Sequence, residues 1–244
     1  MPASLKTTRA RVVISFSLIL ALVVAAAAYL GSYYRADAAA VNAYVEAGGI
    51  TTTVSDGMVV CAPLTAKAGL IFYPGGLVEH TAYIPLMQAL AAKGVHCVLL
   101  QMPGNLAVLD MNAAEGIAAQ FPHITSWYVG GHSLGGSMAA SYGAKHADTL
   151  EGVLLFAAYS TADLTESGLS VFSAYGSEDG VLNMEKYTQY LPNLPAGFTE
   201  LVIAGGCHAG FGMYGPQAGD GTPTLTPEQQ IDITAQAVAE FLFG

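Results

Sequence analysis

A single serine set among glycines is the strongest chemical signal in the sequence. Ser133 stands in GGHSLGG, with Gly131 two residues before it and Gly135 two residues after it. An apolar run precedes this stretch and a helix-forming run follows it. In that context G-x-S-x-G places a hydroxyl on a strained turn, because a strand can pass sharply into a helix there only beside small neighbours. The pattern predicts an exposed nucleophile at Ser133.

Two phosphate-binding motifs fit this glycine-rich turn less well. The stretch around Ser133 does not supply the G-x-G-x-x-G of a dinucleotide site. Gly130 to Ser137 matches a phosphate-binding loop except that Gly136 replaces the lysine, so no cation would pair with the terminal phosphates. A serine that only caps the following helix is the alternative to a nucleophile.

A serine hydroxyl is a weak nucleophile until a base takes its proton, and the base needs a third group to orient it. Among six histidines, His208 directly follows the last apolar strand and is the expected base, with His80 as the alternative. Asp179 follows an earlier strand, and its short side chain before Gly180 suits a fixed orienting carboxylate. Asp163 is the alternative acid, although a helix cap would explain it equally simply.

The same chemistry needs N–H donors for the negative oxygen that develops on the attacked carbonyl. The backbone N–H of Leu134, at the start of the expected helix, is one candidate. The second is expected from the loop that contains YPGG, where we favour the Gly76 N–H and keep Leu77 as the alternative. Three apolar residues are candidates for the substrate-binding lining, although each has an equal claim to the core: Leu77, Phe211 and Tyr214.

These residues require a scaffold that brings the ends of several strands together. Apolar strands are expected over 49–54, 58–64, 68–74, 95–102, 126–131, 152–159, 170–176 and 198–206. Helices are expected over 81–94, within 106–120, over 133–145 and 184–190, and after a capping box at 226–229. This alternation predicts a mostly parallel sheet covered on both faces, with an opening hairpin at one edge.

With these motifs in place, the chain resembles the α/β-hydrolases from about Thr51 to its C-terminus. The resemblance rests on YPGG, GGHSLGG, YGSEDG and GGCHAGFG, and on the chain order serine, aspartate, histidine. YPGGLVEHTAY and HAGFGMYGPQAGDG look like a compact bacterial subgroup, similar in build to dienelactone hydrolases. The resemblance implies an α/β fold with an eight-stranded sheet, one strand antiparallel, flanked by helices. It also implies hydrolysis of an ester, lactone or thioester.

Two features depart from the family pattern. Pro74 stands where a histidine usually precedes the oxyanion glycine, and only about a dozen residues follow GVLLFAAY before the next strand, too few for a lid.

The strand order that the resemblance implies places MVVCAPL beside VHCVLLQM, so we expect a cross-strand Cys61–Cys97 disulfide. The odd count of three cysteines otherwise favours small buried residues over a disulfide-stapled fold.

Taken together, these observations predict a serine hydrolase that works through an acyl-enzyme on Ser133, with His208 as base and Asp179 as orienting acid. No metal or organic cofactor is implied. An acyltransferase with the same three residues, or a non-catalytic binding protein of the same fold, stays open. The expected substrate is a small-molecule or surface-presented ester.

Charge disfavours one class of partner. Eight Lys and Arg against eighteen Asp and Glu give a net charge of −10, which argues against a nucleic-acid partner. The chain is 53% hydrophobic and 11% charged, which is apolar for a soluble protein. Part of that apolar excess lies at the N-terminus.

Residues 1–35 have the pattern of a signal anchor. An uncharged run over 12–34 is long enough to cross a bilayer as a transmembrane helix, and three cations precede it: Lys6, Arg9 and Arg11. With Arg35 alone after the run, this charge bias places the catalytic domain outside the cytoplasm on a single-pass anchor. A signal peptide cleaved near 36–38, giving a secreted protein, is the alternative.

The domain organisation follows from that interpretation. Residues 36–48 are expected to be a juxtamembrane linker and residues 49–244 the α/β-hydrolase domain.

Overall fold

The structure is a computed structural model that describes residues 15–17, 19–24, 31–55 and 57–244. The chain divides into two compact units, Met1–Tyr33 and Tyr34–Gly244. In the first unit, residues 15–17 and 19–24 are helical and exposed. The rest of the predicted transmembrane run before Gly31 lies outside the described residues. Within the described part of the chain, no helix is both long enough and apolar enough to cross a membrane.

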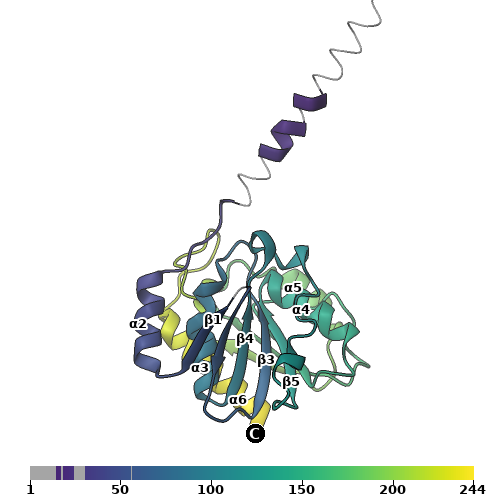
Figure 1. Ribbon diagram of the computed structural model, residues 1–244. Coiled ribbons are helices and arrows are strands. Elements are labelled where there is room, and N and C mark those ends of the chain that lie inside the picture. The colour runs from purple at the N-terminus through teal and green to yellow at the C-terminus, as the bar shows by residue number, and fades with distance from the viewer. Residues whose placement is uncertain (1–14, 18, 25–30, 56) are drawn as a thin grey trace, which may run out of the picture. The chain divides into compact units, whose positions relative to one another are not determined.

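The second unit is built on one eight-stranded sheet (Figure 1). Its strands are β1 (Thr51–Ser55), β2 (Met58–Ala62), β3 (Ala68–Tyr73), β4 (Val95–Leu100), β5 (Trp127–His132), β6 (Gly152–Phe156), β7 (Ser170–Gly176) and β8 (Thr199–Ile203). They lie in the order β1-β2-β4-β3-β5-β6-β7-β8. β2 runs antiparallel to both β1 and β4, and the remaining neighbours are parallel. The expected mostly parallel sheet with one antiparallel strand is confirmed.

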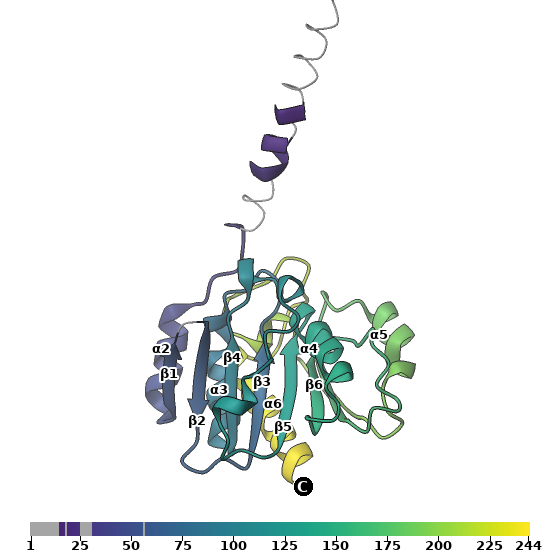
Figure 2. The same ribbon diagram turned by 45° about the vertical axis from the view of Figure 1, so that its right-hand side comes forward.

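Helices cover both faces of the sheet (Figures 1 and 2). The α-helices are α2 (Ala38–Gly48), α3 (Ile84–Ala92), α4 (Leu134–Lys145), α5 (Met184–Tyr190) and α6 (Pro227–Phe243). The short 3₁₀ turns are η1 (His80–Tyr83), η2 (Pro103–Asn105), η3 (Ala107–Leu109), η4 (Ala118–Gln120), η5 (Leu191–Asn193) and η6 (Ala209–Phe211). Helices α3 and α6 pack together on one face with α2 beside α3, and α4 packs on the other face against β5 and β6.

The central strands are continuously apolar because both of their faces are buried. In β3, Leu70 and Phe72 belong to the core under α3 and α6, whereas Ile71 and Tyr73 belong to the core under α4. All six residues of β3 and all six of β4 are buried. This two-sided burial fixes the register of the strands, because a slip by one residue would exchange every side chain between the two cores.

Two segments differ from the sequence-based expectation. The segment 36–48, expected to be a linker, is mostly the helix α2, which is capped by Asp37, packs on α3 and buries Val41 in the core. The stretch 106–120, expected to contain a helix, forms only the isolated 3₁₀ turns η3 and η4. Ala107, Ala114 and Ile117 of this stretch are buried in the core under α4, so the segment covers one face of the sheet as a loop.

The expected disulfide is wrong, although the two cysteines do lie on neighbouring strands. Cys61 and Cys97 are directly opposed on β2 and β4, yet both thiols are free. Cys61 Sγ lies 3.6 Å from Thr52 Oγ1, and Cys97 Sγ donates to the Val95 carbonyl at 3.5 Å. Burial raises the pKa of Cys61 to about 11 and raises the pKa of Cys97 well above its ordinary value, so both groups are neutral thiols.

The N-terminus of α6 gives a direct test of the fold. Thr226 Oγ1 accepts from the Gln229 N–H and Gln229 Oε1 accepts from the Thr226 N–H, which completes the predicted capping box. We expect Thr226→Ala to lower the free energy of unfolding by about 1 kcal/mol in a denaturant titration. The exposed Thr222, which caps no helix, is the matched control. Equal stability of the two alanine variants would contradict this assignment.

Candidate active site

Ser133 lies on the sharp turn between β5 and α4. Its backbone has φ 53° and ψ −124°, a conformation that residues other than glycine seldom adopt. The Ser133 N–H donates to the Phe156 carbonyl at 2.9 Å, which ties the turn to the end of β6. The side chain is half-buried. The predicted strained strand–turn–helix arrangement is therefore present.

The flanking glycines are required by close backbone contacts. A Cβ added to Gly135 would overlap the carbonyl oxygens of Tyr73 and Pro74, and one added to Gly131 would lie 2.5 Å from the Tyr73 oxygen. The turn thus presses against the end of β3, and neither position has room for a larger residue. These contacts explain the G-x-S-x-G spacing physically.

Asp179 and His208 meet at the carboxyl ends of β7 and β8. His208 Nδ1 lies 2.9 Å from Asp179 Oδ2 and 3.1 Å from Oδ1, and both side chains are 1% exposed. Asp179 Oδ1 also accepts from the N–H groups of Val181 and Leu182, at 2.9 and 2.7 Å. The carboxylate is held by its own turn and directed at the imidazole.

This contact fixes the tautomer of the imidazole. A carboxylate accepts, so Nδ1 of His208 carries the hydrogen and Nε2 of a neutral ring presents a lone pair. Nε2 is buried and has no hydrogen-bond partner in the described residues. It is not bonded to Ser133 here, but Ser133 and His208 line the same pocket of about 230 Å³. A group able to accept a proton and a hydroxyl thus border one pocket.

The backbone N–H groups of Gly76 and Leu134, the two expected donors, have no acceptor among the described residues. Gly76 lies beside Leu134, since a Cβ added to it would stand 2.9 Å from Leu134 Cδ2. Leu134 opens α4, where the helix dipole adds positive character. The alternative donor, Leu77 N–H, is already bonded to the Asn105 carbonyl at 2.7 Å. Gly76 is therefore the better candidate of the two.

The three residues expected in the pocket lining lie elsewhere. Phe211 is fully buried against Phe156 and His132, and Tyr214 packs on Tyr83 in the same core. Neither they nor Leu77 are among the described residues that line the pocket at Ser133. Besides Ser133 and His208, that pocket is lined by Leu134, Ser137, Ala157, Ala158, Tyr159, Val181, Leu182 and Asn183.

The alternative base and acid do not join the site. His80 opens η1 and is not among the described residues lining the pocket of Ser133. Asp163 accepts from the N–H and the hydroxyl of Thr165, at 3.0 and 2.6 Å, on the exposed loop after β6. It stabilises its own turn. That loop, residues 157–169, contains neither helix nor strand.

A buried polar network, which no sequence motif indicates, lies behind the site. Tyr83 Oη lies 2.8 Å from His132 Nδ1 and accepts from the Gly75 N–H at 3.2 Å. The His132 ring stands 4.5 Å from that of His208, and burial lowers the pKa of His132 well below its usual value. The neutral His132 and Tyr83 thus support the turn that carries Gly76. The buried hydroxyl of Tyr83 gives no local signal of this role in the sequence.

Helix α6 holds the loop of His208. Gln230 Oε1 accepts from the Cys207 N–H at 2.9 Å, and Gln230 Nε2 donates to the Cys207 carbonyl at 2.8 Å. Gln230 is 1% exposed. A glutamine on the apolar side of a helix is the one sequence feature that could have pointed to it.

Comparisons with known proteins agree with this architecture. A family model described as "Alpha/beta hydrolase family" matches residues 69–232. A predicted CIB-like hydrolase from Thermoplasma acidophilum is 14% identical, with a TM-score of 0.58 over 79% of this chain and 100% of that one. A dienelactone hydrolase from Anabaena variabilis is 14% identical, with a TM-score of 0.53 over 79% and 97%.

A third solved structure matches over more of the chain. It is a membrane phospholipase A described as a bacterial virulence factor, 13% identical, with a TM-score of 0.59 over 95% of this chain and 97% of that one. At these identities the likeness concerns the fold. No curated protein matches the chain.

The turn at Ser133 can be tested through Gly135. We expect Gly135→Ala to destabilise the protein by about 1–3 kcal/mol or to prevent folding, because the new methyl group meets backbone oxygens that cannot rotate away. Gly197→Ala is the control, since a Cβ there meets no atom of the described residues within 4 Å apart from its chain neighbours. Thermal unfolding of both variants measures the difference. Similar melting temperatures would contradict the crowded turn.

Proposed function

Because the chain belongs to the alpha/beta hydrolase family, we propose that it is a serine hydrolase that cleaves a carboxylic ester, lactone or thioester. The observation that supports this proposal is the Asp179–His208 contact, which orients the imidazole of a histidine that lines the same pocket as Ser133. In this proposal, Ser133, His208 and Asp179 act as a Ser-His-Asp arrangement that activates a hydroxyl.

In the proposed reaction, Ser133 Oγ attacks the substrate carbonyl while its proton passes to His208 Nε2. Asp179 keeps the imidazole oriented and stabilises the imidazolium that forms. The carbonyl oxygen becomes negative and is met by the N–H groups of Gly76 and Leu134. Each such donor typically contributes about 10²–10³ in turnover.

The intermediate collapses when its bond to the leaving oxygen or sulfur breaks, and the leaving group takes the proton from Nε2. Water then attacks the acyl group on Ser133, and His208 accepts the proton of that water. Collapse of the second intermediate releases the acid and returns the proton to Ser133 Oγ. The cycle is closed without a cofactor.

The pocket favours a small acyl group. Its volume of about 230 Å³ lies below the roughly 300–1,000 Å³ of sites that enclose drug-sized ligands. Apolar walls come from Ala157, Ala158, Val181 and Leu182, which suit a short hydrocarbon chain. We propose that the acyl part enters this pocket while the leaving group stays at the open surface.

We also propose that residues 12–34 anchor the domain to a membrane, with the catalytic domain outside the cytoplasm. The charge pattern and the length of the apolar run support this proposal. At the end of the run, Tyr34 joins the compact unit: its N–H donates to the Leu77 carbonyl at 2.8 Å, and its carbonyl accepts from the Glu79 N–H at 2.9 Å.

The proposed nucleophile can be tested by covalent labelling. A fluorophosphonate probe should modify the wild-type chain on Ser133, and the chain should hydrolyse a short soluble ester such as p-nitrophenyl acetate. Ser133→Ala should lose the labelling and almost all hydrolysis, because this variant lacks the hydroxyl that attacks the carbonyl. Peptide mass mapping identifies the labelled residue.

Ser137→Ala is the matched control, because this serine lines the same pocket but its hydroxyl is bonded to the Tyr159 carbonyl at 2.8 Å. It should still be labelled. A wild-type chain that folds but neither reacts with the probe nor cleaves esters would refute the proposed function.

The proposed location is tested by fractionating cells that express the full chain. We expect the intact polypeptide in the membrane fraction after a carbonate wash and its release by detergent. A soluble exported form with a mass starting near residue 37 would show a cleaved signal instead. An intact soluble chain in the cytoplasm would contradict export.

A further inference from the structure

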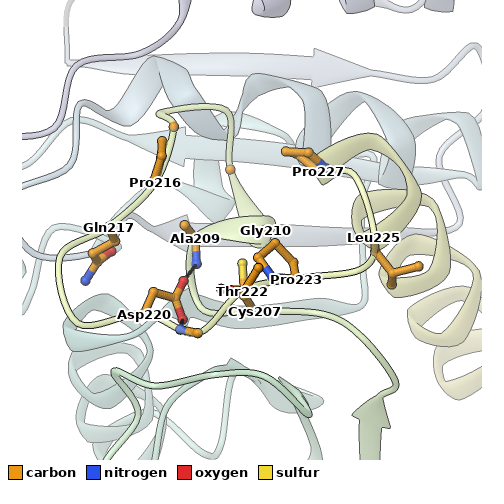
Figure 3. A pocket seen from close by; sticks show the side chains of 13 residues that line it. Cys207, Ala209, Gly210, Pro216, Gln217, Asp220, Thr222, Pro223, Leu225 and Pro227 are labelled. Carbon is orange, nitrogen blue, oxygen red and sulfur yellow. Dashed lines mark hydrogen bonds between the residues drawn. The ribbon is translucent and has the colours of Figure 1, made fainter.

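Asp220 lies on the loop between η6 and α6, outside the three proposed catalytic residues. Its carboxylate accepts four backbone N–H groups. Oδ1 accepts from Gly221, His208 and Gly180, at 2.9, 3.1 and 3.2 Å, and Oδ2 accepts from Ala209 at 2.8 Å. In Figure 3 the side chain of Asp220 points toward Ala209, and a dashed line marks the hydrogen bond between the two residues. Two of the donors thus belong to the segment that carries the proposed base.

The donor at Gly180 belongs to the turn of Asp179. The loop lies directly against this turn: a Cβ added to Gly180 would stand 2.5 Å from the Gly219 oxygen, and one added to Gly221 would overlap the Glu178 oxygen. One carboxylate therefore bonds both to the residue after Asp179 and to His208 itself. It bridges the two segments that have to meet for the imidazole to be oriented.

The charge state of Asp220 strengthens this bridge. Partial burial raises its pKa, but the N–H groups of Ala209, Gly180 and His208 outweigh that effect, so the pKa is lower than usual. Asp220 is therefore ionised at neutral pH. Hydrogen bonds to an ionised acceptor are about twice as strong as those between neutral groups.

The space between the His208 segment and the loop of Asp220 is not completely filled. A cavity of about 470 Å³ lies there, bordered by Cys207, Ala209 and Gly210 on one side and by the loop 215–227 on the other (Figure 3). The side chain of Gln230 holds the backbone of Cys207, on one side of His208. The Asp220 carboxylate holds the N–H groups of His208 and Ala209, so it anchors the other side.

We propose that Asp220 is a positioning residue, which fixes the turn of Asp179 against the loop of His208 so that the imidazole stays aligned with Ser133. Asp220 is not among the described residues that line the pocket of Ser133. The expected loss of kcat rests on the proposed function. The expected loss of the Asp179–His208 hydrogen bond does not.

The loop has other attachments, so loss of the carboxylate should leave the fold intact. Thr224 and Leu225 N–H groups donate to the Gly205 carbonyl, at 2.9 and 3.2 Å, and the Ala218 N–H donates to Tyr34 Oη at 3.0 Å. None of these contacts involves Asp220. We therefore expect a variant at Asp220 to fold, so that it can be compared directly with the wild type.

The test uses Asp220→Ala in the full chain, solubilised in detergent. Two readouts are needed: kcat and KM for p-nitrophenyl acetate, and the far-downfield proton NMR signal of the His208 Nδ1–H that is bonded to Asp179. Displacement of a catalytic group by about 1 Å costs on the order of 10² in rate, so we expect kcat to fall by about that factor. KM should change little, and the downfield signal should broaden or disappear.

Asp220→Asn serves as the conservative variant, and it decides the question if Asp220→Ala does not fold. Its amide oxygen can still accept from His208 and Gly180, while its NH₂ group faces the Ala209 N–H. We expect an intermediate kcat and a retained but shifted downfield signal. Asp163→Ala removes a carboxylate that, among the described residues, bonds to Thr165 of its own exposed turn, and it should match the wild type in both readouts.

The failures of the two proposals are distinguishable. A wild-type chain without esterase activity would refute the proposed function, and the NMR signal would still report on Asp220. A wild-type chain without the downfield signal would overturn the inference. It would also be overturned if Asp220→Ala kept both the signal and the wild-type kcat, or if it lowered the melting temperature while the signal stayed unchanged.

Discussion

The hydrogen bond between Asp179 and His208 is the contact on which the rest of the site depends. It joins the ends of β7 and β8, and it sets which nitrogen of the imidazole carries the hydrogen. Parallel strands favour this meeting, because their carboxyl ends lie along one edge of the sheet. Ser133 reaches the same edge from β5, through a turn whose glycines let it press against β3.

Much of this arrangement could be predicted from local sequence signals. The strands, the turn at Ser133 and the capping box at Thr226 each depend on residues adjacent in the chain, and all are present. The opposed positions of Cys61 and Cys97 also followed from the implied strand order. The disulfide did not follow from the strand order, because the orientation and burial of each thiol depend on neighbours such as Thr52 from another strand.

The supporting residues could not be predicted in the same way, because their roles arise from distant contacts. Phe211 and Tyr214 were candidates for the pocket, yet both are buried in the core at and just after η6. Asp220 looks like an ordinary turn residue in AGDG until the fold brings the backbone of Gly180, forty residues earlier, to its carboxylate. Sequence patterns thus identified the groups that could react, and the structure identified the groups that hold them.

A crystal structure of the chain after reaction with an organophosphonate ester would test the central claim most directly. The account predicts phosphorus bonded to Ser133 Oγ, the phosphoryl oxygen within hydrogen-bond distance of the Gly76 and Leu134 N–H groups, and His208 Nε2 facing Oγ. An adduct on another residue, or a phosphoryl oxygen directed away from both N–H groups, would contradict it.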